Sequence, residues 1–254
     1  MRRALRIVGR ALVAVLALGL VLFAGLYLSQ RYPLPAAVEG DAAEALARRI
    51  NTAVRADAWA RTGAIRWTAP DGGRHLWDRA RNLARYEKGG LRVLVDLGAR
   101  RGLAWQDGHK LQGPARHRAV ERAWARWAND SFWLNPVPKM FDDGVRRGLV
   151  HDDDGRDALL VTYTLGGVTP GDRYLWRVDG DGRPRAWRMW VSILPIPGLE
   201  ATWAAWITLP TGAMVATEHR VAGLTLRLRD IAAAESLAAL EGATDPFAPL
   251  ATER

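Results

Sequence analysis

The pattern of apolar and polar positions divides the chain into one unbroken apolar segment and a longer region of short periods. The segment from Ala11 to Gln30 carries no charge. A hydrocarbon core about 30 Å thick needs about 20 helical residues to cross it. Because the segment has no polar face from Ala11 to Leu28, the pattern predicts a membrane-spanning helix rather than an amphipathic core helix.

Charge at the two ends of this segment predicts its orientation. Arg2, Arg3, Arg6 and Arg10 precede it, and Arg31 follows. Positive charge stays in the cytoplasm, so the N-terminus is expected inside and the rest of the chain outside. We therefore expect a single-pass protein of a bacterial inner membrane, anchored through residues 11–30, with its C-terminal domain in the periplasm.

A cleaved signal peptide is the alternative to an anchor. Its apolar region is usually about 7–15 residues long and ends in an A-x-A-like site. Here the apolar run is longer, and Leu34-Pro35-Ala36-Ala37 places proline where a peptidase needs an extended stretch. The pattern favours an uncleaved anchor. A lipoprotein is excluded because lipidation needs a cysteine and the chain has none.

After the anchor the spacing predicts one exported domain. We divide the chain into a basic flank and anchor (1–31), a spacer (32–37), the domain (38–242) and a flexible tail (243–254). Apolar residues recur at helical spacing over 38–59 and 114–127. Elsewhere the period is two, with turn residues between the runs. The predicted strands lie at 65–68, 76–77, 83–86, 91–97, 101–106, 158–165, 173–179, 184–193, 201–209, 214–221 and 224–231.

These elements predict an α+β fold. The short connections permit antiparallel pairing only. We expect a strongly curved antiparallel sheet, a half-barrel of about ten strands, with two or three helices on one face.

Composition removes several classes of function. The formal charge is +9, but the five arginines flanking the anchor supply five of these nine charges, which leaves little for nucleic acid. The 5 histidines show no metal-ligand spacing, and no nucleophile elbow or phosphate loop is present. Asp152-Asp153-Asp154-Gly155 starts like a calcium loop but lacks the closing glutamate, so an acidic turn is the better interpretation. We expect no metal, no cofactor and no enzymatic activity.

The 12 tryptophans are the second unusual feature. Trp187 and Trp190 are three residues apart and point to opposite faces of a regular strand, as do Trp203 and Trp206. Apolar residues on both faces of a sheet indicate cover on one side and either a lined cavity or a membrane on the other. Core filling, an apolar ligand site and contact with lipid headgroups all remain open.

One set of segments resembles a group of uncharacterised bacterial envelope proteins. It comprises residues 129–145, 166–172, 187–191 and 199–203, which include Phe132-Trp133-Leu134 and Trp187-Arg188-Met189-Trp190. Their architecture looks like that of the lipoprotein localisation factors (LolA/LolB-like), half-barrels closed by helices. The resemblance implies that acyl chains sit between sheet and lid, with the 114–127 helix and the Phe132-Trp133-Leu134 loop as lid.

This resemblance leads to our expected function. A chain held by an anchor cannot shuttle, so carrier activity is not transferred to it. We expect a membrane-anchored periplasmic module that holds a membrane lipid, acyl chain or lipoprotein tail. The alternative is a structural or interaction domain with a solid core and an envelope protein partner. The expected ligand-binding residues are Trp124, Trp127, Phe132, Trp133, Leu134, Trp187, Trp190 and Trp203.

Overall fold

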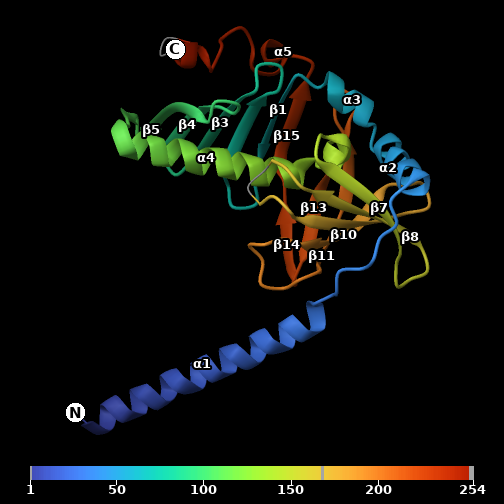
Figure 1. Cartoon of the computed structure of the whole chain (residues 1–254). Helices are drawn as coiled ribbons and strands as arrows, with labels where there is room; N and C mark the ends of the chain where they lie inside the picture. Colours follow the sequence, from blue (N-terminus) through green and yellow to red (C-terminus); the bar gives the residue numbers. More distant parts are fainter. Residues whose placement is uncertain (1, 167–168, 252–254) are drawn as a thin grey trace.

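The chain consists of a long apolar helix followed by a domain of two antiparallel sheets (Figure 1). A computed structural model describes residues 2–166 and 169–251. Helix α1 (Arg2–Gln30) contains the predicted span: Leu12–Gln30 has a mean hydropathy of 2.5 and no buried residue. It is the one helix among the described residues that is long and apolar enough to cross a membrane.

The remaining helices are short except for one. They are α2 (Asp41–Ala53), α3 (Ala56–Arg61), α4 (Gly113–Leu134), the 3-10 helix η1 (Val137–Phe141), α5 (Leu237–Glu241) and α6 (Ala248–Ala251). The helix predicted over 38–59 is divided because Arg55 adopts a left-handed conformation, φ 54°. The helix predicted over 114–127 continues to Leu134, so Phe132-Trp133-Leu134 is its last turn rather than a loop.

The strands form two sheets, each with a simple antiparallel order. The first has the order β15-β1-β2-β3-β4-β5-β6 and the second β12-β13-β11-β10-β9-β8-β7, with β14 paired to β13. Their bounds are β1 Ala64–Thr68, β2 Arg74–Asp78, β3 Leu83–Lys88, β4 Leu91–Asp96, β5 Arg101–Gln106, β6 His109–Lys110, β7 Val145–His151, β8 Asp157–Tyr163, β9 Arg173–Val178, β10 Pro184–Trp190, β11 Leu199–Thr202, β12 Ala204–Thr208, β13 Met214–Val221, β14 Leu224–Arg227 and β15 Arg229–Ala234.

The predicted α+β fold with an open, curved antiparallel sheet is confirmed. The sheet has more strands than expected, and it is divided at a single residue. Leu228 separates β14, which pairs with β13, from β15, which pairs with β1. Leu228 is buried, with 4% of its surface exposed, in the core cluster that also holds Trp67 and Leu209. The predicted strand 224–231 therefore continues from one sheet into the other.

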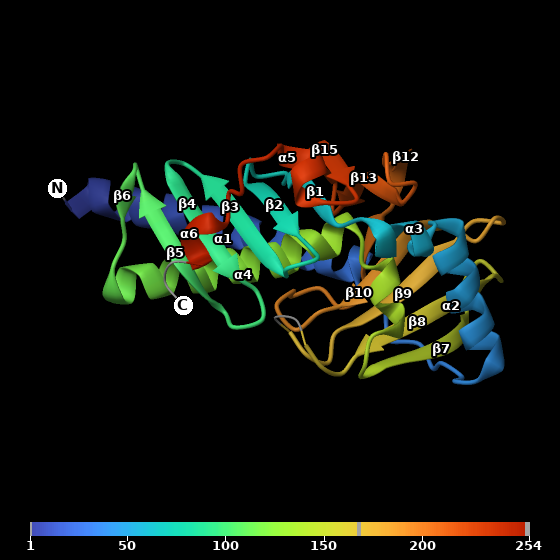
Figure 2. The ribbon, with the colours of Figure 1, turned by 90° about the horizontal axis from the view of Figure 1, so that it is seen from above.

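Helix α4 lies across both sheets (Figure 2). Its first part packs Ala119, Val120 and Ala123 against β3, β4 and β5. Its last turn places Phe132 and Trp133 over the inner face of the 8-stranded sheet. Helix α2 covers the same face from the β7 side through Leu46 and Ile50. The inner face of each sheet is therefore closed by helix.

The C-terminal segment covers the opposite face of the first sheet. Phe247 is 2% exposed and packs with Leu76, Leu83 and Leu94. We expected residues 243–254 to form a flexible tail. Up to Ala251 the segment is instead docked, because Phe247 is buried and Asp245 accepts two hydrogen bonds from Arg81, at 2.7 and 2.8 Å. Residues 252–254 of that tail lie outside the described part of the chain.

The segment between anchor and domain crosses the outer face of the 8-stranded sheet. We call Tyr32 to Val38 the strap. Its first residue donates a backbone hydrogen bond to Pro197 (2.9 Å), and its last exchanges two with Leu149 (2.9 and 2.8 Å). Gly148 faces it so closely that a Cβ there would lie 2.6 Å from the Cβ of Ala37. The expected spacer 32–37 is thus packed against the sheet.

Candidate functional site

The strongest candidate site is an aromatic cluster on the inner face of the 8-stranded sheet. The cluster consists of Phe132, Trp133, Tyr163, Tyr174, Trp176, Trp187 and Trp203. Alternation along β9 and β10 explains its composition, because residues two apart share a face. Trp187 lies opposite Trp176 in the β9–β10 register, so two indoles meet on the same face.

Trp187 is the centre of this cluster. It is fully buried, and its ring lies 4.6–5.6 Å from five other rings, centroid to centroid. Phe132 is close to parallel with it, at an interplanar angle of 24°, while Trp203 is edge-on at 76°. These are favourable aromatic geometries. The rings fill the space beneath the end of α4.

The cluster also contains buried polar atoms without partners. The indole Nε1 atoms of Trp176, Trp187 and Trp203, and the hydroxyl of Tyr163, find no acceptor or donor among the described residues. Burial raises the pKa of Tyr163 well above its ordinary value, so this hydroxyl stays protonated. Leaving a buried donor unpaired costs about 1–3 kcal/mol. The cluster therefore offers hydrogen-bond donors to a group that enters it.

His219 stands at the edge of the cluster. Its ring lies 4.4 Å from that of Trp203 and 5.2 Å from that of Trp133. Nδ1 is 3.0 Å from the carbonyl oxygen of Thr202. Burial lowers the pKa of His219 to about 4, although nearby backbone carbonyls favour the charged ring. The imidazole is therefore neutral at neutral pH, which suits an apolar site.

The apolar cluster reaches the end of the domain at which the anchor joins it. Val191 and Leu194, from the β10–β11 connection, pack against the same core as Trp187, and so does Tyr27 in the last turns of α1. Helix α1 and the aromatic cluster thus pack into the same hydrophobic core.

No protein-family profile matches the chain, and no curated protein matches it. The chain is similar to a solved DUF1329 family protein from Desulfovibrio piger, at 12% identity over 82% of this chain and 97% of that one, with a TM-score of 0.40. It is also similar to a domain described as an outer membrane lipoprotein-sorting protein from Vibrio parahaemolyticus, at 11% identity over 82% and 100%, with a TM-score of 0.32.

These neighbours agree with the resemblance read from the sequence. An uncharacterised family and a lipoprotein-sorting domain are the two kinds of protein that it named.

The structure brings four of the eight expected site residues together and separates the other four. Phe132, Trp133, Trp187 and Trp203 belong to the cluster. Leu134 turns into the neighbouring core with Trp59 and Trp67, while Trp124 and Trp127 pack on the first sheet. Trp190 lies on the outer face, where its Nε1 donates to the carbonyl of Tyr32 at 3.0 Å. Tyr163, Tyr174 and Trp176 complete the cluster and His219 lies at its edge; none of these four residues was expected in the site.

Two hollows on the domain lie away from the cluster. One, of about 120 Å³, lies between β3, β4, β5, α4 and α6 and is lined by Leu83, Asp96, Arg101, Gly102, Leu103, Arg116 and Leu250. The other is an open depression beside the β1–β2 turn at Gly72 and the β3–β4 turn at Gly89 and Gly90. Neither contains any of the eight expected residues.

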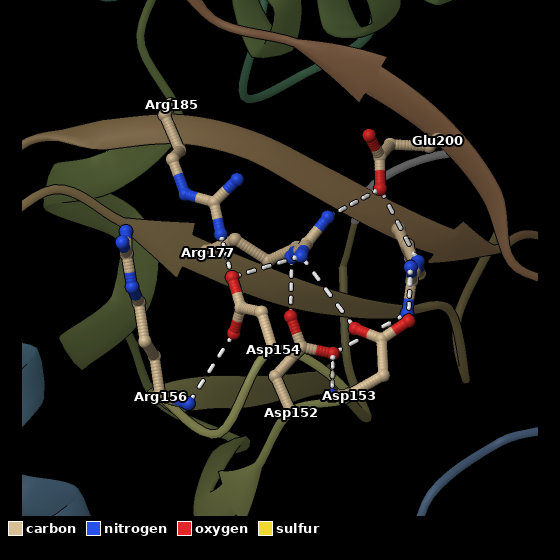
Figure 3. Close-up of polar contacts among 8 residues, drawn as sticks. Asp152, Asp153, Asp154, Arg156, Arg177, Arg185 and Glu200 are labelled. Carbon is tan, nitrogen blue, oxygen red and sulfur yellow. Dashed lines mark hydrogen bonds and ion pairs between the residues drawn. The ribbon is translucent and has the colours of Figure 1, made fainter.

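A network of ion pairs between aspartate, glutamate and arginine side chains lies on the outer face of the 8-stranded sheet (Figure 3). The turn after β7 places Asp152, Asp153 and Asp154 against Arg177 of β9 and Arg188 of β10. Both arginines also contact Glu200 of β11, at 2.9 and 3.2 Å. The guanidinium of Arg188 stacks 3.8 Å from the ring centre of Tyr32. The assembly thus joins the β7–β8 turn and three strands of the domain to the strap.

Its carboxylates are already neutralised. Burial raises the pKa of Asp152, whereas hydrogen bonding with Asp152 and with Arg188 lowers that of Asp153 to about 2. The three aspartates could offer ligand atoms to one ion. The guanidinium groups of the neighbouring arginines already supply the positive charge beside these carboxylates. The aspartates therefore form an ion-pair network rather than a cation site.

A buried histidine–aspartate pair was also missed by sequence reasoning. His75 Nε2 lies 2.9 Å from Asp130 Oδ2, and the two side chains are 0% and 5% exposed. The His75 ring stacks on Trp67 at 4.6 Å. The pair joins β2 to α4 across the first sheet and is enclosed on all sides by packed rings and helix. Its geometry supports a structural role.

Proposed function

We propose that this chain is a membrane-anchored envelope module that holds a lipid, an acyl chain or a lipoprotein tail against the aromatic cluster. The observation that carries the proposal is that Tyr27 of α1, together with Val191 and Leu194, packs against the same core that contains Trp187. An acyl chain leaving the bilayer beside α1 would meet apolar side chains of this core. Displacement of Phe132 and Trp133 at the end of α4 would admit it.

The unpaired donors give the proposal chemical detail. A lipid chain carries an ester or amide near its polar end, and its carbonyl oxygen accepts hydrogen bonds. Trp176, Trp187 and Trp203 each present a buried N–H with no acceptor among the described residues. A ligand carbonyl placed there would recover the free energy that these groups lose on burial. The proposed role is binding, without catalysis.

The proposed location follows from α1. Residues 1–31 would form the cytoplasmic flank and the inner-membrane anchor, 32–37 the spacer, and 38–242 the periplasmic domain. The helix fits an envelope protein in length and hydropathy, with 19 residues at a mean of 2.5. The four arginines before it would hold the N-terminus in the cytoplasm.

The rival function is a structural or interaction domain of the cell envelope with a solid core. One observation favours it: the rings around Trp187 already lie at contact distance, between 4.6 and 5.6 Å. A filled core needs no ligand. Under this reading the outer surface would bind an envelope protein partner.

Photocrosslinking within the full chain separates the two functions. A benzophenone amino acid replaces Phe132 in one variant and Trp124 in the other, since both lie on α4 but in different clusters. The lipid proposal expects an acyl-lipid adduct by mass spectrometry at position 132 and none at 124. The absence of a lipid adduct at both positions would contradict the lipid proposal and support a domain with a solid core.

A further inference from the structure

Three large apolar side chains stand exposed at turns of the 8-stranded sheet. Leu165, Ile193 and Leu224 are 66%, 68% and 65% exposed. Single exposed apolar residues are common on protein surfaces, whereas their concentration in one place marks an interaction site. Whether these three residues mark an interaction site therefore depends on whether they lie together on the sheet.

The antiparallel order places all three at the same end of the sheet. Leu165 follows β8 and Ile193 follows β10, and alternate connections of an antiparallel sheet share an end. Ala201 near the start of β11 pairs with Val221, so the β13–β14 turn with Leu224 lies at that end too. We call these three residues the apolar tips.

The anchor reaches the domain at this end. Pro197, in the same connection as Ile193, accepts the backbone N–H of Tyr32 at 2.9 Å. Tyr27 packs against the core that includes Leu194. In Figure 1 the C-terminal end of α1 lies below the sheet, beside the β10–β11 connection and the β13–β14 turn. A bilayer crossed by α1 would lie next to the apolar tips.

The connections that carry Leu165 and Ile193 are tied to each other. Asp172 is buried, and its carboxylate accepts the backbone N–H of Ser192 at 3.1 Å and the hydroxyl of Thr169, so the β8–β9 and β10–β11 connections are tied together. Leu165 lies over Gly144, where a Cβ would approach it to 2.7 Å. These apolar side chains therefore cannot fold back onto the domain to avoid water. They are placed to contact an adjacent apolar surface.

Three exposed arginines lie at this end of the sheet. Arg31 follows α1, Arg173 opens β9 beside the first connection, and Arg220, which pairs with Glu218 at 3.2 Å, lies one residue before the end of β13. Cations near the surface of an anionic leaflet are attracted to its headgroups. Apolar tips with arginines beside them match the headgroup and upper acyl layers of a bilayer.

We infer that Leu165, Ile193 and Leu224 insert into the interface of the bilayer that α1 spans, seating the sheet end on the membrane. The occupant is the outer leaflet surface, because the anchor fixes that surface against these turns. The inference rests on the proposed function only through the membrane-spanning role of α1. It holds whether or not the aromatic cluster admits a lipid.

The absence of cysteine from the chain allows a clean test. Single cysteines carrying a nitroxide spin label replace Leu165, Ile193 or Leu224 in the full chain, reconstituted in nanodiscs of anionic and zwitterionic phospholipid. Accessibility to oxygen, which concentrates in lipid, is compared with accessibility to a water-soluble nickel chelate. Val38 and Ile207, 74% and 39% exposed and away from this end, serve as controls, and Leu20 in α1 is the reference position expected to lie in lipid.

The expected result is a higher ratio of oxygen to nickel accessibility at all three tips than at Val38 and Ile207, approaching that at Leu20. Ratios at the tips equal to those of the controls, with Leu20 in lipid, would overturn the inference and leave the anchor intact. A label at Leu20 that is open to nickel would overturn both the anchor and this inference. Neither outcome depends on a lipid adduct at Phe132, so the lipid proposal is tested separately.

Discussion

The indole Nε1 of Trp190 donates a hydrogen bond of 3.0 Å to the backbone carbonyl of Tyr32, which joins the central part of the 8-stranded sheet to the first residue after the anchor. Gly198 lies beneath the same carbonyl: a Cβ there would approach the Tyr32 oxygen to 2.5 Å. The domain is therefore packed directly against the segment that follows α1. A change at either residue should be felt at the other.

Replacing Gly198 by alanine should loosen the strap. Gly198 has φ +73°, and its Cβ would meet backbone atoms of Tyr32, which cannot move without breaking the bond to Trp190. Gly223→Ala is the control, since Gly223 has φ +79° but open space around it. Both variants lose about 1 kcal/mol for the positive φ, and Gly198→Ala should lose about 1–2 kcal/mol more. Chemical unfolding of the two full-chain variants measures the difference; equal losses would contradict the packing role of the strap.

The free energy of unfolding should decrease as pH is lowered, because His219 is buried in its neutral form. Burial lowers the pKa of this ring from 6.5 to about 4. Because the folded value is the lower one, the unfolded chain takes up the proton first as pH decreases, so the neutral ring stabilises the fold fully only above about pH 6.5. Between pH 6.5 and 4 this costs about 3 kcal/mol. The free energy of unfolding measured across that range should decline less in His219→Asn than in the native chain.

The ion-pair assembly should depend on Asp152 far more than on an exposed aspartate. Its carboxylate is 1% exposed and lies between Arg177 and Arg188. Asp152→Asn leaves two largely buried guanidinium groups without their main counter-charge, and we expect a loss of about 3 kcal/mol. Asp181→Asn is the control, because Asp181 is 57% exposed in its pair with Arg183 and should change stability by less than about 1 kcal/mol. Comparable losses in the two variants would show that the assembly is solvated.

Tyr163→Phe distinguishes a dry core from one that receives a polar group. In the structure the hydroxyl is buried without a partner among the described residues, so its removal should be neutral or stabilise by up to about 1 kcal/mol. If lipid occupies the cluster through a hydrogen bond to this hydroxyl, the variant should instead retain less lipid on purification. Unfolding of delipidated protein and lipid recovery from membranes measure the two effects.

Orientation in the membrane can be tested with the same cysteine-free background. Arg10→Cys should remain unlabelled by an impermeant maleimide in cells whose outer membrane is opened, whereas Val38→Cys, 74% exposed, should react. Intact mass of the purified chain would separate an uncleaved anchor from a signal peptide. Loss of the first thirty or so residues would contradict anchoring.

Most strands were predictable because they are marked by alternation and closed by turn residues. Met214–Val221 matches its predicted range, and most other predicted strands differ by a few residues at their ends, whereas β7 (Val145–His151) was not predicted. The strand over 201–209 is divided at Trp203, two residues before Ala205, which has φ 52°. A single residue with positive φ leaves no pattern in hydrophobicity, which is also why the division of the first helix at Arg55 was not foreseen.

The candidate site was predictable only in part because it depends on register. Periodicity assigns Trp187 and Trp190 to opposite faces but does not say which face is inner, so both were expected in one site. Trp176 joins the cluster because it lies opposite Trp187 in the pairing of β9 with β10. Pairing across strands is set by the whole sheet, and the sequence of either strand alone does not contain it.

The strap also determines where the domain can be cut. Strand β7 is the outermost strand of its sheet, and Val38 covers part of its free edge through two hydrogen bonds to Leu149. A recombinant fragment that starts at Glu39 would expose those backbone groups together with the indole N–H of Trp190, and an open edge of this kind promotes self-association. Starting at Tyr32 keeps both covered. The few residues that look like a tether are thus the protection against aggregation that any soluble version of this domain must retain.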